Sequence, residues 1–260
     1  MKTEQTESVL LDSPKKSTKE PVIEINGLYK SFGNQEVLKN LSFKLFDGEN
    51  LVVLGKSGSG KSVLIKCIVG LLRSDSGIIN VFDQNVLTLK RKELDDVRQK
   101  IGFLFQSGAL YDSMTVKENL EFPLKRMEKQ LKQKEIDEKI IEALENVGLP
   151  EVLNKMPSEL SGGMRKRISL ARTIVVDPMI MLYDEPTTGL DPVTSDEISS
   201  LINDIQKKYK TSSIIITHDI ECARMTADRL IMLQDGEVYE QGNLNKFEKS
   251  TDLIIRAFFK

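Results

Sequence analysis

Apolar residues along the chain form short β-type runs that alternate with longer segments of helical spacing. The short runs predict strands at residues 22–29, 41–46, 50–55, 77–82 and 101–106. Two later runs, 179–184 and 213–217, are continuously apolar, which is typical of buried strands in a parallel sheet covered on both faces. Helical spacing is found at 63–72 and again from about Val193 and Ile220. The pattern therefore predicts an α/β fold.

The middle of the chain, from about Thr115 to Val176, is helical in pattern and strongly charged. Its segment 129–148 is amphipathic and ends at Gly148, just before Pro150, which is a typical helix stop. The pattern predicts a helical insertion in the α/β core. We divide the chain into a mobile N-terminal tail at 1–20, a main domain at 21–242 with a helical subdomain at about 107–176, and a C-terminal helical tail at 243–260.

The composition is that of a globular protein, with 40% hydrophobic and 29% charged residues. A formal net charge of -2 gives no basic field for nucleic acid, so we expect no nucleic-acid partner. The two cysteines, Cys67 and Cys222, have neither CxxC nor zinc spacing and are typical of reduced thiols in a cytosolic protein. No apolar run approaches the roughly 18 residues of a membrane helix, and the N-terminus has no signal-peptide core.

A glycine-rich segment between the strand 50–55 and the helix 63–72 carries the most specific signal, because it fits G-x-x-x-x-G-K-S/T. Glycines let backbone N–H groups close around phosphates, and the helix N-terminus adds positive potential. Lys61 would reach the β- and γ-phosphates of ATP, and Ser62 would bind Mg²⁺. A flexible glycine-serine turn would not explain this pair at this offset. The predicted nucleotide contacts are Gly55, Lys56, Ser57, Gly58, Ser59, Gly60, Lys61, Ser62 and Val63.

Two acidic residues, Asp184 and Glu185, follow the buried strand 179–184. An aspartate at such a strand end holds Mg²⁺ in P-loop enzymes, directly or through water. A carboxylate one residue later points elsewhere and can polarise the attacking water. The plainer alternative is a strand-end turn with two solvated carboxylates before Pro186. The phosphate loop in the same chain favours the catalytic interpretation.

A second glycine-rich helix start is predicted at Ser161-Gly162-Gly163. Serine and glycine at a helix N-terminus make a further anion site, although a plain N-cap with a glycine hinge has the same pattern. The loop at 55–62 already cradles the phosphates within its own subunit. A second N-terminus aimed at the same ATP must therefore come from elsewhere.

Taken in order, these elements resemble the ABC-type ATPases, over roughly Val22 to Gly242. GKSGSGKS is similar to the Walker A loop, LSGGM to the signature loop and IMLYDE to Walker B. The resemblance implies a P-loop NTPase (RecA-like) core with an antiparallel β subdomain and a helical signature subdomain. It also implies a head-to-tail pair of subunits, with each ATP between the Walker A loop of one subunit and the signature loop of the other.

The same resemblance implies roles for residues outside these three motifs. Phe32 matches the aromatic residue that stacks on adenine, and Asp191 lies in the D-loop. Gln106 matches the Q-loop glutamine, which contacts Mg²⁺ and water and senses the transport partner. The expected Mg²⁺ ligands are therefore Ser62, Gln106 and Asp184, and the expected nucleotide contacts extend to Phe32, Gln106, Ser161, Gly162, Gly163 and Asp191.

His218, the only histidine of the chain, matches the switch histidine of that family. The resemblance implies that it reaches the γ-phosphate and holds the arrangement of Glu185 and water. A metal role is disfavoured because no second histidine exists to share it, whereas a packed structural histidine remains the alternative. The expected catalytic residues are Glu185, His218, Gln106 and Lys61.

Two stretches resemble one branch of the family, the ATPases of MCE-type (Mla) lipid transport systems, which move phospholipid or related lipids between membranes. They are the segment after Gln106 and the signature LSGGMRKRISLAR, in which Met164 precedes three basic residues. A solvated basic helix turn is the plainer interpretation of those three residues. A small-molecule importer and a soluble, non-transport assembly complex are the alternative functions.

The resemblance implies ATP and Mg²⁺ as cofactors and a second copy of the chain as a partner. It also implies a membrane permease, and with it an MCE-domain lipid-binding protein and a small regulatory subunit, at the cytoplasmic face of the cell membrane. Leu110, Tyr111 and Met114 are the expected apolar anchors for a helix of the permease. The C-terminal segment fits either a docking helix for a partner or a packed terminal helix.

Overall fold

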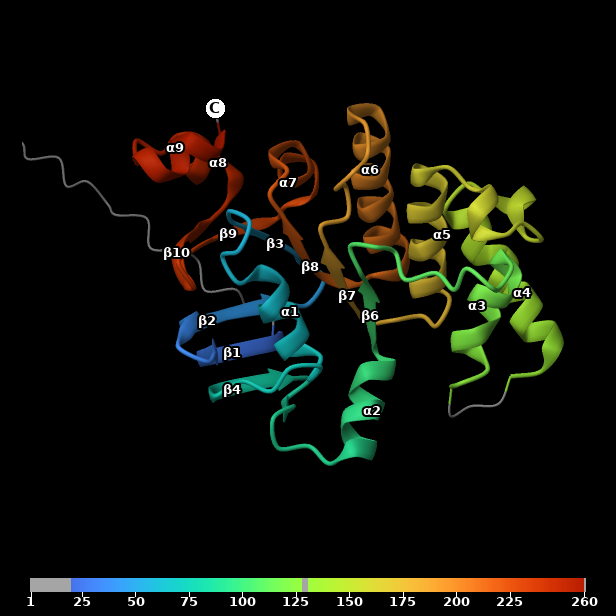
Figure 1. Ribbon diagram of the computed structural model, residues 1–260, viewed down its shortest axis with the longest axis horizontal. Coiled ribbons are helices and arrows are strands. Elements are labelled where there is room, and N and C mark those ends of the chain that lie inside the picture. Colours follow the sequence, from blue (N-terminus) through green and yellow to red (C-terminus); the bar gives the residue numbers. More distant parts are fainter. Residues whose placement is uncertain (1–19, 128–130, 260) are drawn as a thin grey trace, which may run out of the picture.

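The computed structural model describes residues 20–127 and 131–259 (Figure 1). Apart from Glu20, the predicted N-terminal tail lies outside the described residues. Within them, no helix has both the length and the apolar character needed to cross a membrane.

A central sheet of six strands is found in the described part of the chain. Its members are β3 Asn50–Leu54, β6 Ile101–Leu104, β7 Ile180–Asp184, β8 Ser212–Thr217, β9 Arg229–Gln234 and β10 Glu237–Gly242. Their order is β10-β9-β3-β8-β7-β6, and all pairs are parallel except β9 with β10. The predicted α/β fold with a parallel core sheet is confirmed.

A second, antiparallel sheet packs beside the first. It contains β1 Pro21–Phe32, β2 Gln35–Phe46, β4 Ser76–Val81 and β5 Gln84–Asn85, in the order β2-β1-β4-β5. In Figure 1 it lies at the lower left, below the central sheet. The antiparallel β subdomain expected from the resemblance is therefore present.

Helices cover both faces of the central sheet. Their bounds are α1 Lys61–Ile68, α2 Arg91–Gln99, α3 Val116–Leu124, α4 Gln133–Asn146, α5 Gly162–Ile174, α6 Pro192–Tyr209, α7 Ile220–Thr226, α8 Leu244–Glu248 and α9 Leu253–Phe259, with 3-10 turns at Pro150–Val152 and Pro157–Glu159. The helices α3, α4 and α5 gather at one end of the sheet, beyond β6 (Figure 1). They fall within the segment whose sequence pattern is helical.

The alternation of side chains along β3 shows why its apolar run is continuous. Val52 and Leu54 pack into one core with residues of α3 to α9, whereas Leu51 and Val53 pack into a second core with α1 and the antiparallel sheet. All four side chains are fully buried. Because both faces are covered, each of these four positions favours an apolar residue.

Parallel pairing brings the carboxyl ends of three strands to one edge of the sheet. Leu54 of β3 is in register with Thr217 of β8, and Asp184 of β7 is in register with Ile216. The residues that follow these strand ends therefore emerge side by side. In open α/β sheets, ligands bind at this edge.

The C-terminal helices α8 and α9 pack on the rest of the molecule. Phe247 and Ile255 are buried in the core, and the ring of Phe259 lies 5.9 Å from that of Phe247. These contacts agree with the packed terminal helix, the second of the two interpretations of this segment.

Candidate functional site

A cavity of about 740 Å³ opens at the carboxyl edge of the central sheet, within the size range of ligand sites. We call it cavity A and define it by its lining residues: Val37, Lys56, Ser57, Gly58, Gly60, Lys61, Ser62, Val63, Gln106, Glu185, His218, Ala257 and Phe258. Most of the predicted phosphate loop and three of the other predicted site residues thus face one space.

The loop between β3 and α1 forms the floor of cavity A. Gly60 has a φ of +98°, and a Cβ there would lie 2.8 Å from the carbonyl oxygen of Val37, so a side chain is excluded. At Gly55 a Cβ would lie 2.6 Å from the carbonyl oxygen of Leu233. Gly55 and Ser59 do not line cavity A. The glycines therefore let the loop pack closely against the chain behind it, as a phosphate-binding loop requires.

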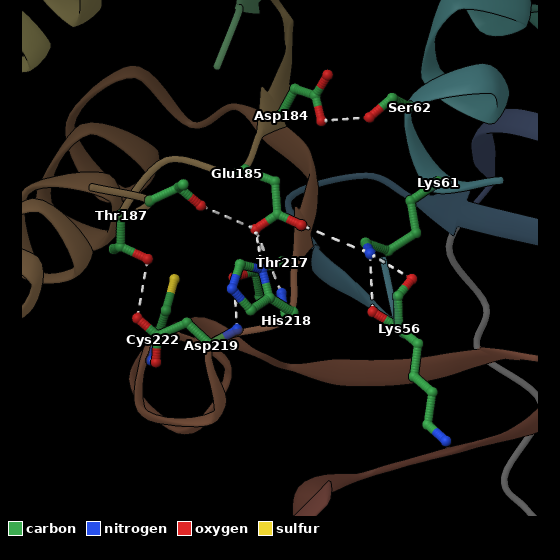
Figure 2. Close-up of polar contacts among 12 residues, drawn as sticks. Lys56, Lys61, Ser62, Asp184, Glu185, Thr187, Thr217, His218, Asp219 and Cys222 are labelled. Carbon is green, nitrogen blue, oxygen red and sulfur yellow. Dashed lines mark hydrogen bonds and ion pairs between the residues drawn. The ribbon is translucent and has the colours of Figure 1, made fainter. Parts of the chain in front are cut away.

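Lys61 begins α1 and is almost completely buried. Its ammonium donates to the carbonyl oxygens of Gly55, at 2.7 Å, and Lys56, at 3.1 Å (Figure 2). The loop thus curls around the lysine head group and fixes a positive charge at the cavity floor. A phosphate chain fits this positive charge beside the N-terminus of α1.

Ser62 and Asp184 place two oxygen ligands together. The Ser62 hydroxyl donates to Asp184 Oδ1 at 2.9 Å, and the two side chains lie next to each other (Figure 2). Ser62 lines cavity A, whereas Asp184 does not. Burial raises the pKa of Asp184, an effect that the hydrogen bond from Ser62 opposes. Oxygen ligands of this kind suit Mg²⁺, which takes one or two protein ligands beside phosphate oxygens and water. The described residues contain no cluster of three or more His, Cys, Asp or Glu that could hold a metal alone.

Glu185 follows β7 in an unusual conformation, with a φ of +52°. Its backbone N–H donates to the carbonyl oxygen of Ile216 at 2.8 Å, which ties the residue to β8. Its carboxylate Oε1 lies 3.5 Å from the Lys61 ammonium, and its Oε2 accepts from the Thr188 hydroxyl at 3.3 Å. The conformation and these contacts aim one carboxylate into cavity A, where it can accept a proton from a bound water.

His218 follows β8 and lies across cavity A from the loop. Its Nδ1 is 2.8 Å from Glu185 Oε2, and its backbone N–H donates to the same oxygen at 3.3 Å (Figure 2). The side chain is 60% exposed, so this residue is not the packed core histidine of the alternative interpretation. The arrangement orients the carboxylate and leaves the imidazole accessible to a ligand.

Gln106 and Phe32 differ in their position relative to cavity A. Gln106 is exposed and lines cavity A, while its backbone carbonyl oxygen accepts from the Lys166 ammonium at 2.9 Å. Phe32 ends β1, is half exposed and does not line cavity A. The Lys30 ammonium lies 5.2 Å from the centre of its ring.

The predicted signature residues lie at a different cavity, which we call cavity B. It measures about 450 Å³, and its lining includes Ser161, Gly162, Gly163 and Asp191. None of these four residues lines cavity A. The structure therefore separates the phosphate loop from the signature loop within one chain.

Two of the polar side chains at cavity B, those of Ser161 and Asp191, cap helices. The Ser161 hydroxyl accepts from the backbone N–H of Met164 at 3.2 Å, at the start of α5. Asp191 accepts from the backbone N–H of Thr194 at 3.1 Å, at the start of α6. The hydrogen bonds from Thr194 hold the pKa of Asp191 below its usual range. A plain N-cap is thus present at Ser161, and its neighbouring glycines remain open to a ligand or a partner.

The segment after Gln106 is held by a residue that the sequence pattern did not identify. Asn119 of α3 is fully buried; its Oδ1 accepts from the backbone N–H of Tyr111 at 2.8 Å, and its Nδ2 donates to the carbonyl oxygens of Tyr111 and Met114. Leu110 and Met114 are half-buried, whereas Tyr111 is 41% exposed. Tyr111 is therefore the most accessible of the three predicted anchors.

Comparisons with known proteins agree with this geometry. A family model described as "ABC transporter" matches residues 38–188. The Mycobacterium tuberculosis "Probable ribonucleotide transport ATP-binding protein mkl" is 41% identical over 236 residues, which are 91% of this chain and 66% of that protein. The chain thus spans just under two thirds of the length of the mycobacterial relative.

Two further similarities cover nearly all of the matched protein. The Haemophilus influenzae "Intermembrane phospholipid transport system ATP-binding protein MlaF" is 36% identical over 239 residues, which are 92% of this chain and 90% of that protein. A solved dimeric ATP-binding cassette in a post-hydrolysis state, bound to ADP and Pi, is 32% identical with a TM-score of 0.78, and the match covers 85% of this chain and 98% of that one. The chain belongs to the ABC transporter family and carries the ATP-binding, ATP-hydrolysing domain of that family.

Proposed function

We propose that cavity A binds ATP with Mg²⁺ and that Glu185 polarises the attacking water. The observation that supports this most directly is the position of the Glu185 carboxylate, 2.8 Å from His218 Nδ1 and 3.5 Å from the Lys61 ammonium. Lys61 binds the β- and γ-phosphates, and His218 holds the carboxylate and contacts the γ-phosphate. Ser62, Asp184 and Gln106 hold Mg²⁺, which when bound neutralises phosphate charge.

The proposed active unit is a head-to-tail pair of identical chains. Ser161, Gly162, Gly163 and Asp191 do not line cavity A of their own chain. They act instead on the ATP held in cavity A of the second copy. The N-terminus of α5 of the first copy then faces the γ-phosphate of that ATP. Phe32, half exposed at the end of β1, stacks on the adenine.

We further propose that ATP hydrolysis drives MCE/Mla-type transport of phospholipid between membranes. The similarity to the Haemophilus influenzae MlaF supports this because it extends over 90% of that protein. An importer of small molecules is the second candidate, and the similarity to the mycobacterial protein, whose name refers to ribonucleotide transport, supports it. The two candidates use the same ATPase site and differ in the membrane subunit that the chain drives.

The proposed contact with the membrane subunit is the segment 107–114. Its exposed Tyr111 packs edge-on against Phe122 at a centroid distance of 5.0 Å, and the Arg172 guanidinium lies 5.0 Å from the ring centre. Asn119 fixes the backbone of the same segment. A held loop with an apolar ring at its surface suits the docking of a short helix. The chain would then work at the cytoplasmic face of the membrane, with an MCE-domain protein and a small regulatory subunit as further partners.

The test is copurification of the tagged chain with its native membrane subunit from detergent extracts. Bound lipid is identified by mass spectrometry, and the purified complex is assayed for ATP-dependent phospholipid transfer between vesicles. The matched control is the same complex with Glu185→Gln. A membrane subunit with phospholipid, and transfer that Glu185→Gln abolishes, is the expected result. Uptake of a small solute would support the importer instead, and capture of soluble proteins alone would support an assembly complex.

A further inference from the structure

The basic run Arg165-Lys166-Arg167 in α5 does not form a uniform solvated surface. Arg165 is exposed and donates to the carbonyl oxygen of Leu160 at 2.9 Å. Arg167 is half-buried and donates to Glu197 at 2.6 Å. Lys166, between them, is only 6% exposed and points into the molecule. The alternative interpretation of this run, a solvated helix turn, is therefore wrong for this one lysine.

The Lys166 ammonium reaches two backbone carbonyl groups of the proposed catalytic site. It donates to the carbonyl oxygen of Gln106 at 2.9 Å and lies 3.5 Å from that of Glu185. These residues follow two neighbouring strands, β6 and β7. One side chain of α5, the helix that starts at the signature loop, is thus bonded to both loops that carry proposed catalytic groups.

A charged residue at this position is costly. Burial lowers the pKa of Lys166, and the negative charges of Asp184 and Glu185 oppose that effect. Both hydrogen-bond acceptors of the ammonium are carbonyl oxygens, which are weaker partners for a cation than a carboxylate. A methionine of similar length would fill the same space without this desolvation cost. Packing alone therefore gives no reason for a lysine here.

The contact of Lys166 with Glu185 is made at the backbone, which determines where the Glu185 carboxylate points. The backbone of Glu185 is in the left-handed region, with a φ of +52°, and such a conformation persists only where neighbouring contacts hold it. Lys166 contacts its carbonyl oxygen, Ile216 binds its N–H, and Thr188 and His218 bind its carboxylate. Lys166 also shares the lining of a cavity of about 460 Å³ with Gln106 and Thr188.

We propose that Lys166 is a positioning residue for ATP hydrolysis, which holds Glu185 and Gln106 at fixed places relative to the signature helix. This inference rests on the proposed roles of those two residues. Movement of α5, when its N-terminus contacts the ATP of the second copy, is transmitted through the ammonium to the carboxylate that polarises water. Lys166 itself touches neither ATP nor the water.

The test is a steady-state and binding comparison of Lys166→Met with Lys166→Arg in the full-length chain. For Lys166→Met we expect kcat to fall roughly 10- to 100-fold, because a small displacement of a catalytic group has effects of this size. We expect KM and the affinity for MgATP to stay within about twofold and Tm to be unchanged or higher, since removal of a buried charge is often neutral or stabilising. Lys166→Arg keeps the charge and the donors and is expected to recover most of the rate.

Two controls make the result specific. Lys207→Met removes an exposed lysine of α6 and is expected to leave kcat and Tm unchanged. Glu185→Gln, measured in parallel, tests the site itself: if it retains the wild-type rate, the proposed active site fails, whatever Lys166→Met does.

If Glu185→Gln is inactive while Lys166→Met keeps kcat within twofold, only the role of Lys166 is refuted. A fall in kcat that comes with an equal loss of MgATP affinity and a lower Tm would refute it too, since the effect would then be structural. Failure of Lys166→Arg to exceed Lys166→Met would show that the donated hydrogen bonds are not the cause.

Discussion

The N-termini of α1 and α5 are both rich in glycine and serine, yet they are built for different tasks. At α1 the residue before the helix is Gly60, whose φ is +98° and which has no side chain to cap the helix. At α5 the hydroxyl of Ser161 caps the first turn. The first N-terminus lies in cavity A beside Lys61 and Glu185, and the second lies in cavity B beside Asp191.

This difference shows how one chain can hold two halves of a site. The uncapped N-terminus of α1, with a buried ammonium beside it, forms the proposed phosphate-binding half. The N-terminus of α5 provides two open glycines without a catalytic carboxylate of its own beside them. Gly163 also lies close to α6, where an added Cβ would be 2.7 Å from Thr194 Cγ2. In the proposed head-to-tail pair, another copy of the chain would complete this second half-site.

The strongest effect is expected on the α1 side, from Glu185→Gln. The substitution removes the base and keeps the shape, so ATP should still bind while turnover falls by about 10²- to 10⁴-fold. Phosphate release and nucleotide binding are measured on the same preparation. Glu138→Gln, at an exposed glutamate of α4, is the matched control and should be fully active. Wild-type turnover in Glu185→Gln would remove the catalytic assignment.

Lys61→Ala should act on binding rather than on turnover alone. It deletes the buried charge at the floor of cavity A, and hydrogen bonds to a charged group contribute about 1.5–3 kcal/mol. We expect the affinity for MgATP to fall about 10- to 100-fold, as measured by titration of a fluorescent ATP analogue. An unchanged dissociation constant would contradict the role of the loop, and Lys207→Ala serves as the control for loss of a lysine.

Tyr111→Asp tests the docking surface separately, because it changes neither the N-terminus of α1 nor that of α5. The charge should prevent docking of the membrane subunit and abolish lipid transfer, while basal ATP hydrolysis stays within about twofold of wild type. Tyr29→Asp is a matched control, because Tyr29 is 39% exposed against 41% for Tyr111. If Tyr111→Asp still captures the membrane subunit and supports transfer, the docking surface is elsewhere. Leu110→Asp is a weaker test, since Leu110 is packed against the core.

The smallest effect concerns the packing behind the phosphate loop. Cys67 of α1 is buried, and burial raises the pKa of its thiol to about 11. Because the reactive thiolate is disfavoured below that pKa, the folded chain should not react with a thiol reagent at pH 8. After unfolding in guanidinium the thiol should react at once. Fast labelling of Cys67 in the folded chain, located by peptide mapping, would show that α1 is less firmly packed than described.

Local sequence features predicted the parts of the site that depend on local geometry. The phosphate loop is set by glycines and a lysine at fixed offsets between one strand and one helix, so its position followed from spacing. Asp184 and Glu185 were placed by the apolar strand before them. Four strands of the central sheet, β3, β6, β7 and β8, followed from their apolar runs in the same way.

Some elements were missed or were predicted with different bounds. The helix α2 was missed because Val97 is its one buried residue, so the helical spacing of apolar positions is weak. The strand β9 was missed although its residues form an apolar run. The helix predicted at 63–72 begins two residues earlier, at Lys61, and ends at Ile68, shortly before Gly70 with a φ of +67°.

No simple sequence pattern predicts that Lys166 points into the molecule or that buried Asn119 forms hydrogen bonds with the loop at 111–114. Each depends on which side of a helix meets a loop from a distant part of the chain. A run of three basic residues is usually exposed, and an asparagine in a helix is usually a surface residue. Both assignments required the packed structure.

The most direct test of the paired half-sites uses two covalently linked dimers. One joins a Lys61→Ala chain to a Ser161→Arg chain, and the other joins an unchanged chain to a chain with both substitutions. If each ATP lies between cavity A of one chain and cavity B of the other, the first dimer has one intact site and should hydrolyse ATP, whereas the second has none and should be inactive. If each chain worked with its own signature loop, the second dimer would be about half active and the first inactive, and that result would contradict the account.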